Sequence, residues 1–125
     1  MANLYSEVLL DHFRNPRNFG RLPDADITYE DFNPLCGDRI RIELELNGDV
    51  VKAARFQGDG CAISLAAASM LTELIVGVRI DDAELISNDL LLSSLQSSIK
   101  PARINCALLP LEVLRSGVRT HTRSA

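Results

Sequence analysis

Tryptophan is absent from this 125-residue chain, and so are an excess of basic residues and any long apolar run. Its 13 basic residues are outnumbered by 17 acidic ones, which gives a formal charge of −4. A sequence-independent grip on phosphate backbones needs a basic face, so we expect no nucleic-acid partner. No apolar stretch approaches the length of a bilayer span, and the first residues lack the basic start and apolar core of a signal peptide. We therefore expect a cytoplasmic protein without membrane association.

The motifs of several enzyme classes are missing as well. The sequence contains no P-loop, no GxGxxG, no HExxH and no GxSxG. No internal repeat, low-complexity segment or linker divides the chain. Because 46% of its residues are apolar and 24% are charged, its composition is that of a folded protein, and its length suits one domain over residues 1–125.

Cysteine is scarce, with three residues in the chain. An odd number in a reducing compartment does not make a disulfide framework, so Cys36, Cys61 and Cys106 are buried apolar residues, reactive thiols or metal ligands. A single free cysteine is more often plain core than a ligand. Their surroundings must therefore decide between these alternatives.

The most regular pattern is an alternation of apolar and charged residues over 39–46, which predicts a half-buried strand. A second strand is predicted from Val50 to Phe56, and the intervening Asn47-Gly48 predicts a two-residue hairpin turn. In that register the opposed pairs are Leu46 with Asp49, Leu44 with Val51, Glu43 with Lys52, and Ile42 with Ala53.

Helices are predicted on both sides of this hairpin. Residues 3–13 read as a helix capped by Asn3, and a weak edge strand is predicted at 27–29. After the hairpin, a helix capped by Asp59 is expected to end at Gly77. The remaining expectations are two helices within 80–98 that break near 87–88, a last helix that stops at Gly117, and a frayed tail over about 119–125.

Extending the hairpin register places two cysteines and a carboxylate at one end of the sheet. Asp38 falls opposite Gln57, and Cys36 falls near Asp59, two residues before Cys61. Glycines flank these positions and allow the side chains to converge instead of alternating between faces. The pattern therefore leaves two alternatives open, which are a shared thiol or metal site and plain burial in the core.

The third cysteine is harder to place. Cys61 sits where a helix is expected to begin, and the positive end of a helix favours thiolate over thiol. Cys106 is expected near the start of the last helix, with the same consequence. It is followed by an apolar run, however, and fits a core position best, and nothing local brings it to the other two cysteines.

Three thiolates and one oxygen ligand would suit tetrahedral zinc or the iron of a cluster. The harder ligand, Asp38, would make a bound cluster easier to release. Arg103 lies three residues before Cys106 and could steady a thiolate or persulfide by its fixed charge, although a surface role is equally compatible. His12, on the polar side of the first helix, is expected at the surface rather than at a metal, and His121 is expected to be idle in the tail.

Four segments of the chain occur in the order that is typical of one protein family, namely residues 5–18, 33–38 (NPLCGD), 58–64 (GDGCAIS) and 103–106 (RINC). Through them the chain resembles the IscU/NifU-N/SufU family of iron–sulfur cluster assembly scaffolds. It implies a compact α+β fold in which a three-stranded antiparallel sheet packs against about five helices. It also implies that Cys36, Asp38, Cys61 and Cys106 hold a transient [2Fe-2S] cluster or zinc, and that the cysteines, Cys36 above all, accept persulfide sulfur.

Two departures from the family pattern bear on function. Asn105 stands where the IscU branch has a histidine, and residues 99–103 (IKPAR) replace that branch's chaperone-docking segment, which argues against hand-off through an Hsp70-type chaperone. The segment before Cys106 looks instead like the SufU branch, whereas the short spacing from Cys61 to Cys106 is similar to the IscU branch.

Three functions therefore remain open at the level of sequence. The first is a scaffold without turnover of its own, which takes sulfur from a cysteine desulfurase, binds iron and passes a cluster to apo-proteins. The second is a SufU-like zinc-dependent sulfurtransferase, and the third is a purely structural zinc module. The chain is expected to be a monomer or a weak dimer.

Overall fold

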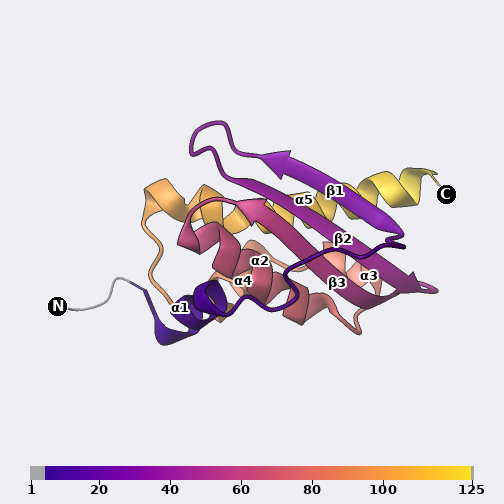
Figure 1. Ribbon diagram of the computed structural model, residues 1–125, viewed down its shortest axis with the longest axis horizontal. Helices are drawn as coiled ribbons and strands as arrows, with labels where there is room; N and C mark the ends of the chain where they lie inside the picture. The colour runs from indigo at the N-terminus through magenta and orange to yellow at the C-terminus, as the bar shows by residue number, and fades with distance from the viewer. Residues whose placement is uncertain (1–4, 125) are drawn as a thin grey trace.

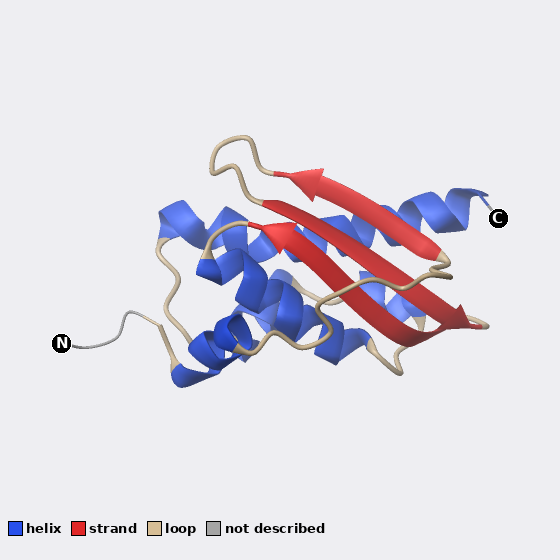
Figure 2. Cartoon of the chain, viewed as in Figure 1, coloured by secondary structure: helices blue, strands red, loops and turns tan. Residues whose placement is uncertain are grey.

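The alternating segment forms the centre of a small antiparallel sheet. In this computed structural model, which describes residues 5–124, strand β2 (Arg39–Asn47) pairs with β3 (Val50–Asp59) on one side and with β1 (Ile27–Phe32) on the other. The edge strand β1 is longer than the predicted 27–29. Figure 2 shows the three strands side by side, with the helices gathered behind and below them. The predicted three-stranded antiparallel sheet is thus confirmed, and its strand order is β1-β2-β3.

The hairpin turn lies one residue later than predicted. Asn47 pairs with Val50, so Gly48 and Asp49 are the central residues of the turn. Gly48 has a φ of 62°, a left-handed value that glycine adopts without steric penalty. The sequence predicts positive φ at both Asn47 and Gly48 as the central residues of the turn. In the structure Gly48 has the positive φ, and it is the first central residue of the turn.

A bulge then shifts the register again. Leu46 lies opposite Val51, but Glu45 lies opposite Ala53, which leaves Lys52 without a partner on β2. The predicted pairings in this hairpin are therefore wrong. The observed pairs are Leu44 with Ala54, Glu43 with Arg55, Ile42 with Phe56, Arg41 with Gln57, and Arg39 with Asp59.

Helix α1 (Glu7–Arg14) is capped by Ser6, whose Oγ accepts a hydrogen bond of 3.0 Å from the backbone N–H of Leu9. The predicted cap, Asn3, lies outside the described residues. The expectation of a surface His12 is wrong, because this residue is only 5% exposed. Its Nδ1 lies 2.7 Å from Oγ of Ser69 and so ties α1 to the neighbouring helix.

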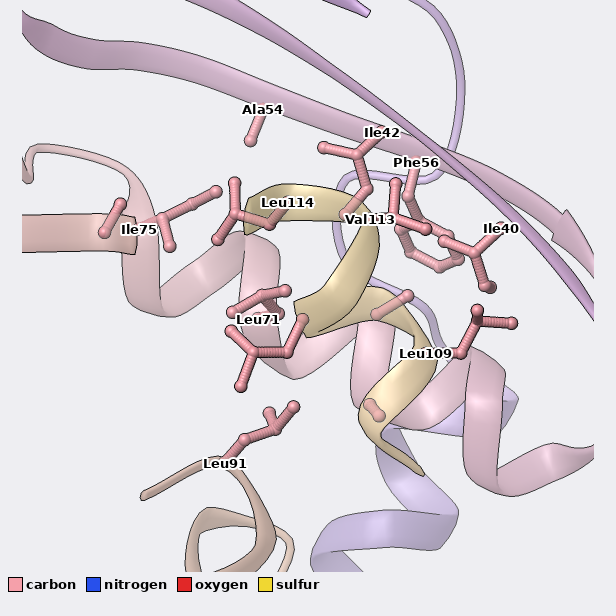
Figure 3. Close-up of a cluster of buried hydrophobic side chains, with 14 of the residues drawn as sticks. Ile40, Ile42, Ala54, Phe56, Leu71, Ile75, Leu91, Leu109, Val113 and Leu114 are labelled. Atoms are coloured by element: carbon pink, nitrogen blue, oxygen red, sulfur yellow. The ribbon is translucent and has the colours of Figure 1, made fainter. Parts of the chain in front are cut away.

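Helices α2 (Ala62–Ile75) and α5 (Ile104–Ser124) cover one face of the sheet. Figure 3 shows Val113 and Leu114 of α5 among apolar side chains of β2, β3 and α2. Nine residues of α2 are buried, because α1 covers the side of α2 that the sheet does not. The core therefore lies between the sheet and these two helices and fixes the ends of β2, β3, α2 and α5 relative to one another.

The segment between these two helices folds as predicted, into α3 (Ile80–Glu84) and α4 (Asn88–Ser94). The break between them lies at the predicted position, where Ser87 caps α4 by accepting a hydrogen bond of 3.0 Å from Leu90 N–H. A short 3-10 turn, η1 (Pro101–Arg103), leads directly into α5. In Figure 1 this turn lies at the same end of the molecule as the tip of the β1–β2 loop.

Helix α5 does not stop at Gly117, and the expected frayed tail is wrong. The helix runs through to Ser124, and Val118 is only 1% exposed. A Cβ atom at Gly117 would lie 3.1 Å from Cβ of Tyr29 and 3.2 Å from Cγ2 of Ile27. The glycine is thus present because α5 approaches β1 closely, which a sequence pattern cannot distinguish from a helix stop.

The outer face of the sheet is partly covered by the loop over residues 15–26, which crosses β3 in Figure 1. Gly20 N–H donates to the carbonyl of Phe56 at 2.9 Å, so the loop is attached to the sheet edge. Glu43, expected on a solvent face, is only 3% exposed, with Arg21 and Arg41 at 3.7 and 3.8 Å. Within residues 5–124, no helix has both the length and the apolarity needed to span a membrane.

Candidate functional site

Three segments far apart in the sequence meet at one end of the molecule. They are the β1–β2 loop that carries Cys36 and Asp38, the link from β3 to α2 that carries Cys61, and the start of α5 that carries Cys106. In Figure 1 these segments all lie at the end of the sheet where β3 finishes. The fold therefore brings all four predicted ligand residues into one region.

The β1–β2 loop holds Cys36 at its tip through hydrogen bonds to Asn33. The carbonyl of Asn33 accepts from the N–H groups of Cys36 and Gly37, at 3.3 and 2.7 Å, and its side-chain oxygen accepts from Leu35 N–H at 2.9 Å. Gly37 has a φ of 76°, which turns the chain back into β2. Cys36 is exposed on a loop with a defined shape.

Asp38 is the central residue of the site. It is 4% exposed, and its Oδ1 accepts a hydrogen bond of 3.1 Å from Cys61 N–H. The N-cap residue of α2 is Cys61, so the prediction of Asp59 as the cap is wrong. Asp38 attaches the start of α2 to the β1–β2 loop through this hydrogen bond. Asp59 instead forms an exposed ion pair with Arg39 at 2.6 Å. The two register shifts explain the difference, because they move Asp38 next to the start of α2.

Gly60 makes this close approach possible. A Cβ atom at Gly60 would lie 2.7 Å from both Cγ and Oδ1 of Asp38, which is closer than real Cβ atoms come. The glycine next to Cys61 is therefore required by contact with Asp38 in the β1–β2 loop rather than by an unusual dihedral angle.

The remaining oxygen of Asp38, Oδ2, lies 3.2 Å from Sγ of Cys61 and 2.5 Å from Oγ of Ser64. Burial raises the pKa of Asp38, but hydrogen bonds from Ser64, from the thiol and backbone of Cys61, and from Cys36 outweigh it and hold the pKa below its usual value. Asp38 is thus a carboxylate at neutral pH and can act as an oxygen ligand.

Cys106 joins the site, which nothing in its local sequence predicts. The Sγ atoms of Cys36 and Cys106 and one carboxylate oxygen of Asp38 all lie within 4.8 Å of one another. Cys61 is not in that group of three, but its thiol touches Asp38. The three thiols differ in accessibility, since Cys36 is exposed, Cys61 is half-buried and Cys106 is buried.

The expectation that Cys106 favours the thiolate is wrong. Although it lies in the first turn of α5, burial raises the pKa of the Cys106 thiol, and hydrogen bonding to Cys36 and the charge of Cys61 raise it further. In the metal-free protein Cys106 therefore carries its proton at neutral pH. A metal ion must displace that proton in order to bind it.

The donor set suits a thiophilic metal. Soft thiolates select zinc or the iron of a cluster, and the single carboxylate is the harder, weaker partner. These four residues are also close enough to act together, since each is linked to another by a short contact. The site thus fits either group, and its side chains do not by themselves distinguish zinc from iron.

Arg103 lies beside this site rather than in it. Its side chain is exposed and lines a pocket with Tyr5, Ile63, Ser98 and Lys100. Among the described residues, no hydrogen bond or ion pair joins Arg103 to a cysteine. Its suggested role in steadying a thiolate stays a prediction.

Sequence reasoning missed Ser64. This residue is fully buried, and its Oγ lies 3.6 Å from Cys61 Sγ and 3.0 Å from the carbonyl oxygen of Cys106, in addition to its contact with Asp38. Its position three residues after Cys61, on the first turn of a helix, could have placed it near the site. A serine in an apolar helix carries no signal of its own, however.

Comparisons with known proteins show which proteins the chain as a whole is similar to. The family model of the NifU-like N-terminal domain matches residues 4–125. A zinc-dependent sulfurtransferase, SufU, of Bacillus subtilis is 42% identical over 135 residues, which cover 94% of this chain and 91% of that protein. An iron-sulfur cluster assembly scaffold protein, IscU, of Aquifex aeolicus is 36% identical over 123 residues, which cover 97% of this chain and 78% of that protein.

Solved structures support the same fold. A crystal structure from Fervidobacterium islandicum AW-1, described as a candidate iron-sulfur cluster assembly scaffold protein for the SUF system, superimposes with a TM-score of 0.79 at 25% identity. The match covers 92% of this chain and 96% of that one. The fold and the sequence of the chain are therefore both similar to those of iron-sulfur cluster assembly proteins.

Proposed function

Because the chain belongs to the family of NifU-like N-terminal domains, we propose that it is a scaffold on which sulfur from a cysteine desulfurase and iron are combined into a labile [2Fe-2S] cluster. The observation that carries this proposal is the grouping of Cys36, Asp38 and Cys106 within 4.8 Å, with Cys61 against Asp38. Iron and sulfur are the cargo in this proposal, and the protein supplies the ligands.

Cys36 is the residue best suited to accept sulfur, because it is the exposed cysteine and sits at the tip of a loop. Its thiolate would attack the terminal sulfur of the desulfurase persulfide. A new S–S bond forms on Cys36, the S–S bond of the donor breaks, and the donor cysteine leaves as a thiolate. Conversion of this sulfur to sulfide takes two further electrons, which a separate reductant must supply.

The buried end of the site then holds the product. Cys61 and Cys106 offer thiolate ligands from the starts of α2 and α5, and Asp38 offers a carboxylate. Replacing one thiolate by an oxygen ligand weakens the hold on a soft metal. This composition favours release of the cluster to apo-proteins over permanent retention.

Zinc-dependent sulfur transfer is the second candidate function. It is favoured by the 42% identity to a sulfurtransferase and by Asn105, which offers no imidazole ligand beside Cys106. When bound, zinc would be held by the same four residues and would order the site. Ligand exchange with the desulfurase would then free one cysteine, namely Cys36 on its exposed loop, to receive sulfur. Both functions share the desulfurase as donor.

The two candidates differ in what happens after sulfur arrives, and this gives the test. The metal-free protein is incubated anaerobically with ferrous iron, cysteine, a thiol reductant and a desulfurase, and the zinc-loaded form is assayed in parallel for sulfide release. A visible thiolate-to-iron spectrum that disappears on transfer to an apo-ferredoxin supports the scaffold. If no cluster forms while the zinc form accelerates the desulfurase, the scaffold proposal is wrong and sulfur relay takes its place.

A further inference from the structure

Ser64 lies among the proposed ligand residues of the site. Its hydroxyl lies within 3.6 Å of three of the four proposed ligand residues, namely Cys61, Asp38 and Cys106. The side chain is fully buried on the first turn of α2. No water needs to be invoked for its hydrogen bonding, because two good oxygen acceptors lie beside it.

Those two acceptors compete for one proton. A serine hydroxyl has a single O–H, whereas Oδ2 of Asp38 lies at 2.5 Å and the carbonyl oxygen of Cys106 lies at 3.0 Å. The hydroxyl can therefore donate to only one of them at a time. In the metal-free protein the charged carboxylate is the stronger acceptor.

The carbonyl of Cys106 is open to Ser64 because of Pro110. In a regular helix this carbonyl would accept from the N–H four residues later, but Pro110 occupies that position inside α5 and has no N–H. The proline thus leaves the Cys106 carbonyl oxygen without its helical hydrogen-bond donor. The hydroxyl of Ser64 lies close enough to donate to this oxygen.

We propose that Ser64 is a positioning residue whose hydroxyl holds Asp38 in the metal-free site and turns to the Cys106 carbonyl when Asp38 gives Oδ2 to a metal ion. This inference rests on the proposed function, since it needs Asp38 to be a ligand. The buried hydroxyl keeps a partner in both states, so neither the arrival nor the release of the metal leaves it unpaired. In the metal-free protein the hydrogen bond from Ser64 keeps the carboxylate of Asp38 directed toward the site.

The chain offers a matched control for the test. Ser69 is also fully buried on α2, but it contacts His12 and the backbone of Arg17, away from the cysteines. Ser64→Ala and Ser69→Ala therefore remove the same group from the same helix. Affinity for Zn²⁺ is measured by competition with a chromophoric chelator, and the unfolding midpoint of each metal-free variant is measured alongside.

Loss of a residue that supports a ligand lowers metal affinity by about 10–100-fold. We expect Ser64→Ala to lower Zn²⁺ affinity by about tenfold, Ser69→Ala to change it less than about twofold, and Ser64→Thr, which keeps the hydroxyl, to restore most of the loss. In an Asp38→Ala background, Ser64→Ala should have no further effect, because there is no carboxylate left to position.

The outcomes separate this inference from the function on which it rests. Suppose that the wild-type protein binds Zn²⁺. If Ser64→Ala binds Zn²⁺ equally well, or if Ser64→Ala lowers the Zn²⁺ affinity by the same factor with and without Asp38, the positioning role is wrong and the proposed function stands. If the wild-type protein itself binds no Zn²⁺ and forms no cluster, both are wrong. A loss in Ser64→Ala that vanishes in the Asp38→Ala background supports the inference.

Discussion

The thiol of Cys61 lies 3.2 Å from Oδ2 of Asp38, although 23 positions separate the two residues. The other carboxylate oxygen accepts from the backbone N–H of Cys61 at 3.1 Å. One side chain thus holds the start of α2 in place and belongs to the candidate site at the same time. Changes at this contact should affect both the stability of the fold and the binding of metal.

Asp38→Ala is therefore expected to destabilise the metal-free protein. It leaves the N–H of Cys61 without its acceptor and removes the stronger of the two acceptors of the Ser64 hydroxyl, which costs about 1–3 kcal/mol. Asp59→Ala is the control, because it removes only an exposed ion pair with Arg39 and should change the free energy of unfolding by less than about 1 kcal/mol. Urea unfolding of both variants gives the comparison, and equal losses would contradict the structural role of the hydrogen bonds to Asp38.

Gly60→Ala should also disturb the site, by contact rather than by loss of a ligand. Its Cβ would press on Cγ and Oδ1 of Asp38, at 2.7 Å, so we expect a destabilisation of about 1–3 kcal/mol and weaker Zn²⁺ binding. The double variant with Asp38→Ala removes the atoms that collide. The double variant should lose less unfolding free energy than the sum of the losses in the two single variants, and simple additivity would show that the contact is not the cause.

The close approach of α5 to β1 gives a prediction far from the site. Gly117→Leu should destabilise the fold by about 1–3 kcal/mol, because even a Cβ there would lie 3.1 Å from Tyr29. Thr122→Leu, on an exposed position of the same helix, is the control and should change the unfolding free energy by less than about 0.5 kcal/mol. If both variants unfold at the same urea concentration as the wild type, the packing of α5 on β1 is described wrongly.

The buried His12 should make stability depend on pH. Burial lowers the pKa of His12 below 6.5, and the positive charge of Arg17 lowers it further, against the opposing effect of Glu73. As the pH falls below 6.5, the unfolded chain takes up the proton before the native protein does, so the free energy of unfolding decreases from pH 6.5 down to the native pKa.

This slope is measured by urea unfolding between pH 7.5 and 5 in a His121→Gln background, in which His12 is the remaining one of the chain's two histidines. Addition of His12→Gln should flatten the pH dependence just below pH 6.5. An unchanged slope would mean that other groups cause it.

How far the sequence predicts this protein depends on whether a feature is local. The alternation along β2 and the apolar periodicity of the helices depend on near neighbours, and they predict the hairpin of β2 and β3 and the order of the helices. The third strand rested on a short pattern at 27–29 and on the family resemblance. The exact register was not predictable. The bulge at Lys52 adds one residue to β3, and the apolar pattern of the sequence does not show where this extra residue lies. Gly117 was misread because a helix stop and a close packing contact call for the same residue.

The site shows the same division. Cys36, Asp38 and Cys61 could be grouped from the hairpin alone, even though its register was wrong, because all three lie near the end of the same two strands. Cys106 could be added only through the family resemblance, since its approach depends on how α5 packs across the sheet. The buried partners, Ser64 and the Cys106 carbonyl, need the three-dimensional contact itself.

The central claim is that this site takes sulfur at Cys36, and direct labelling tests it. The metal-free and zinc-loaded proteins are incubated with a desulfurase and ³⁵S-cysteine, separated without reductant, and the label on the protein is measured together with the masses of the cysteine peptides. The account predicts a persulfide on Cys36 that is lost in Cys36→Ser and kept in Cys106→Ser, because Cys36 is exposed and Cys106 is buried. Label that persists in Cys36→Ser, or no label on the wild-type protein, would contradict it.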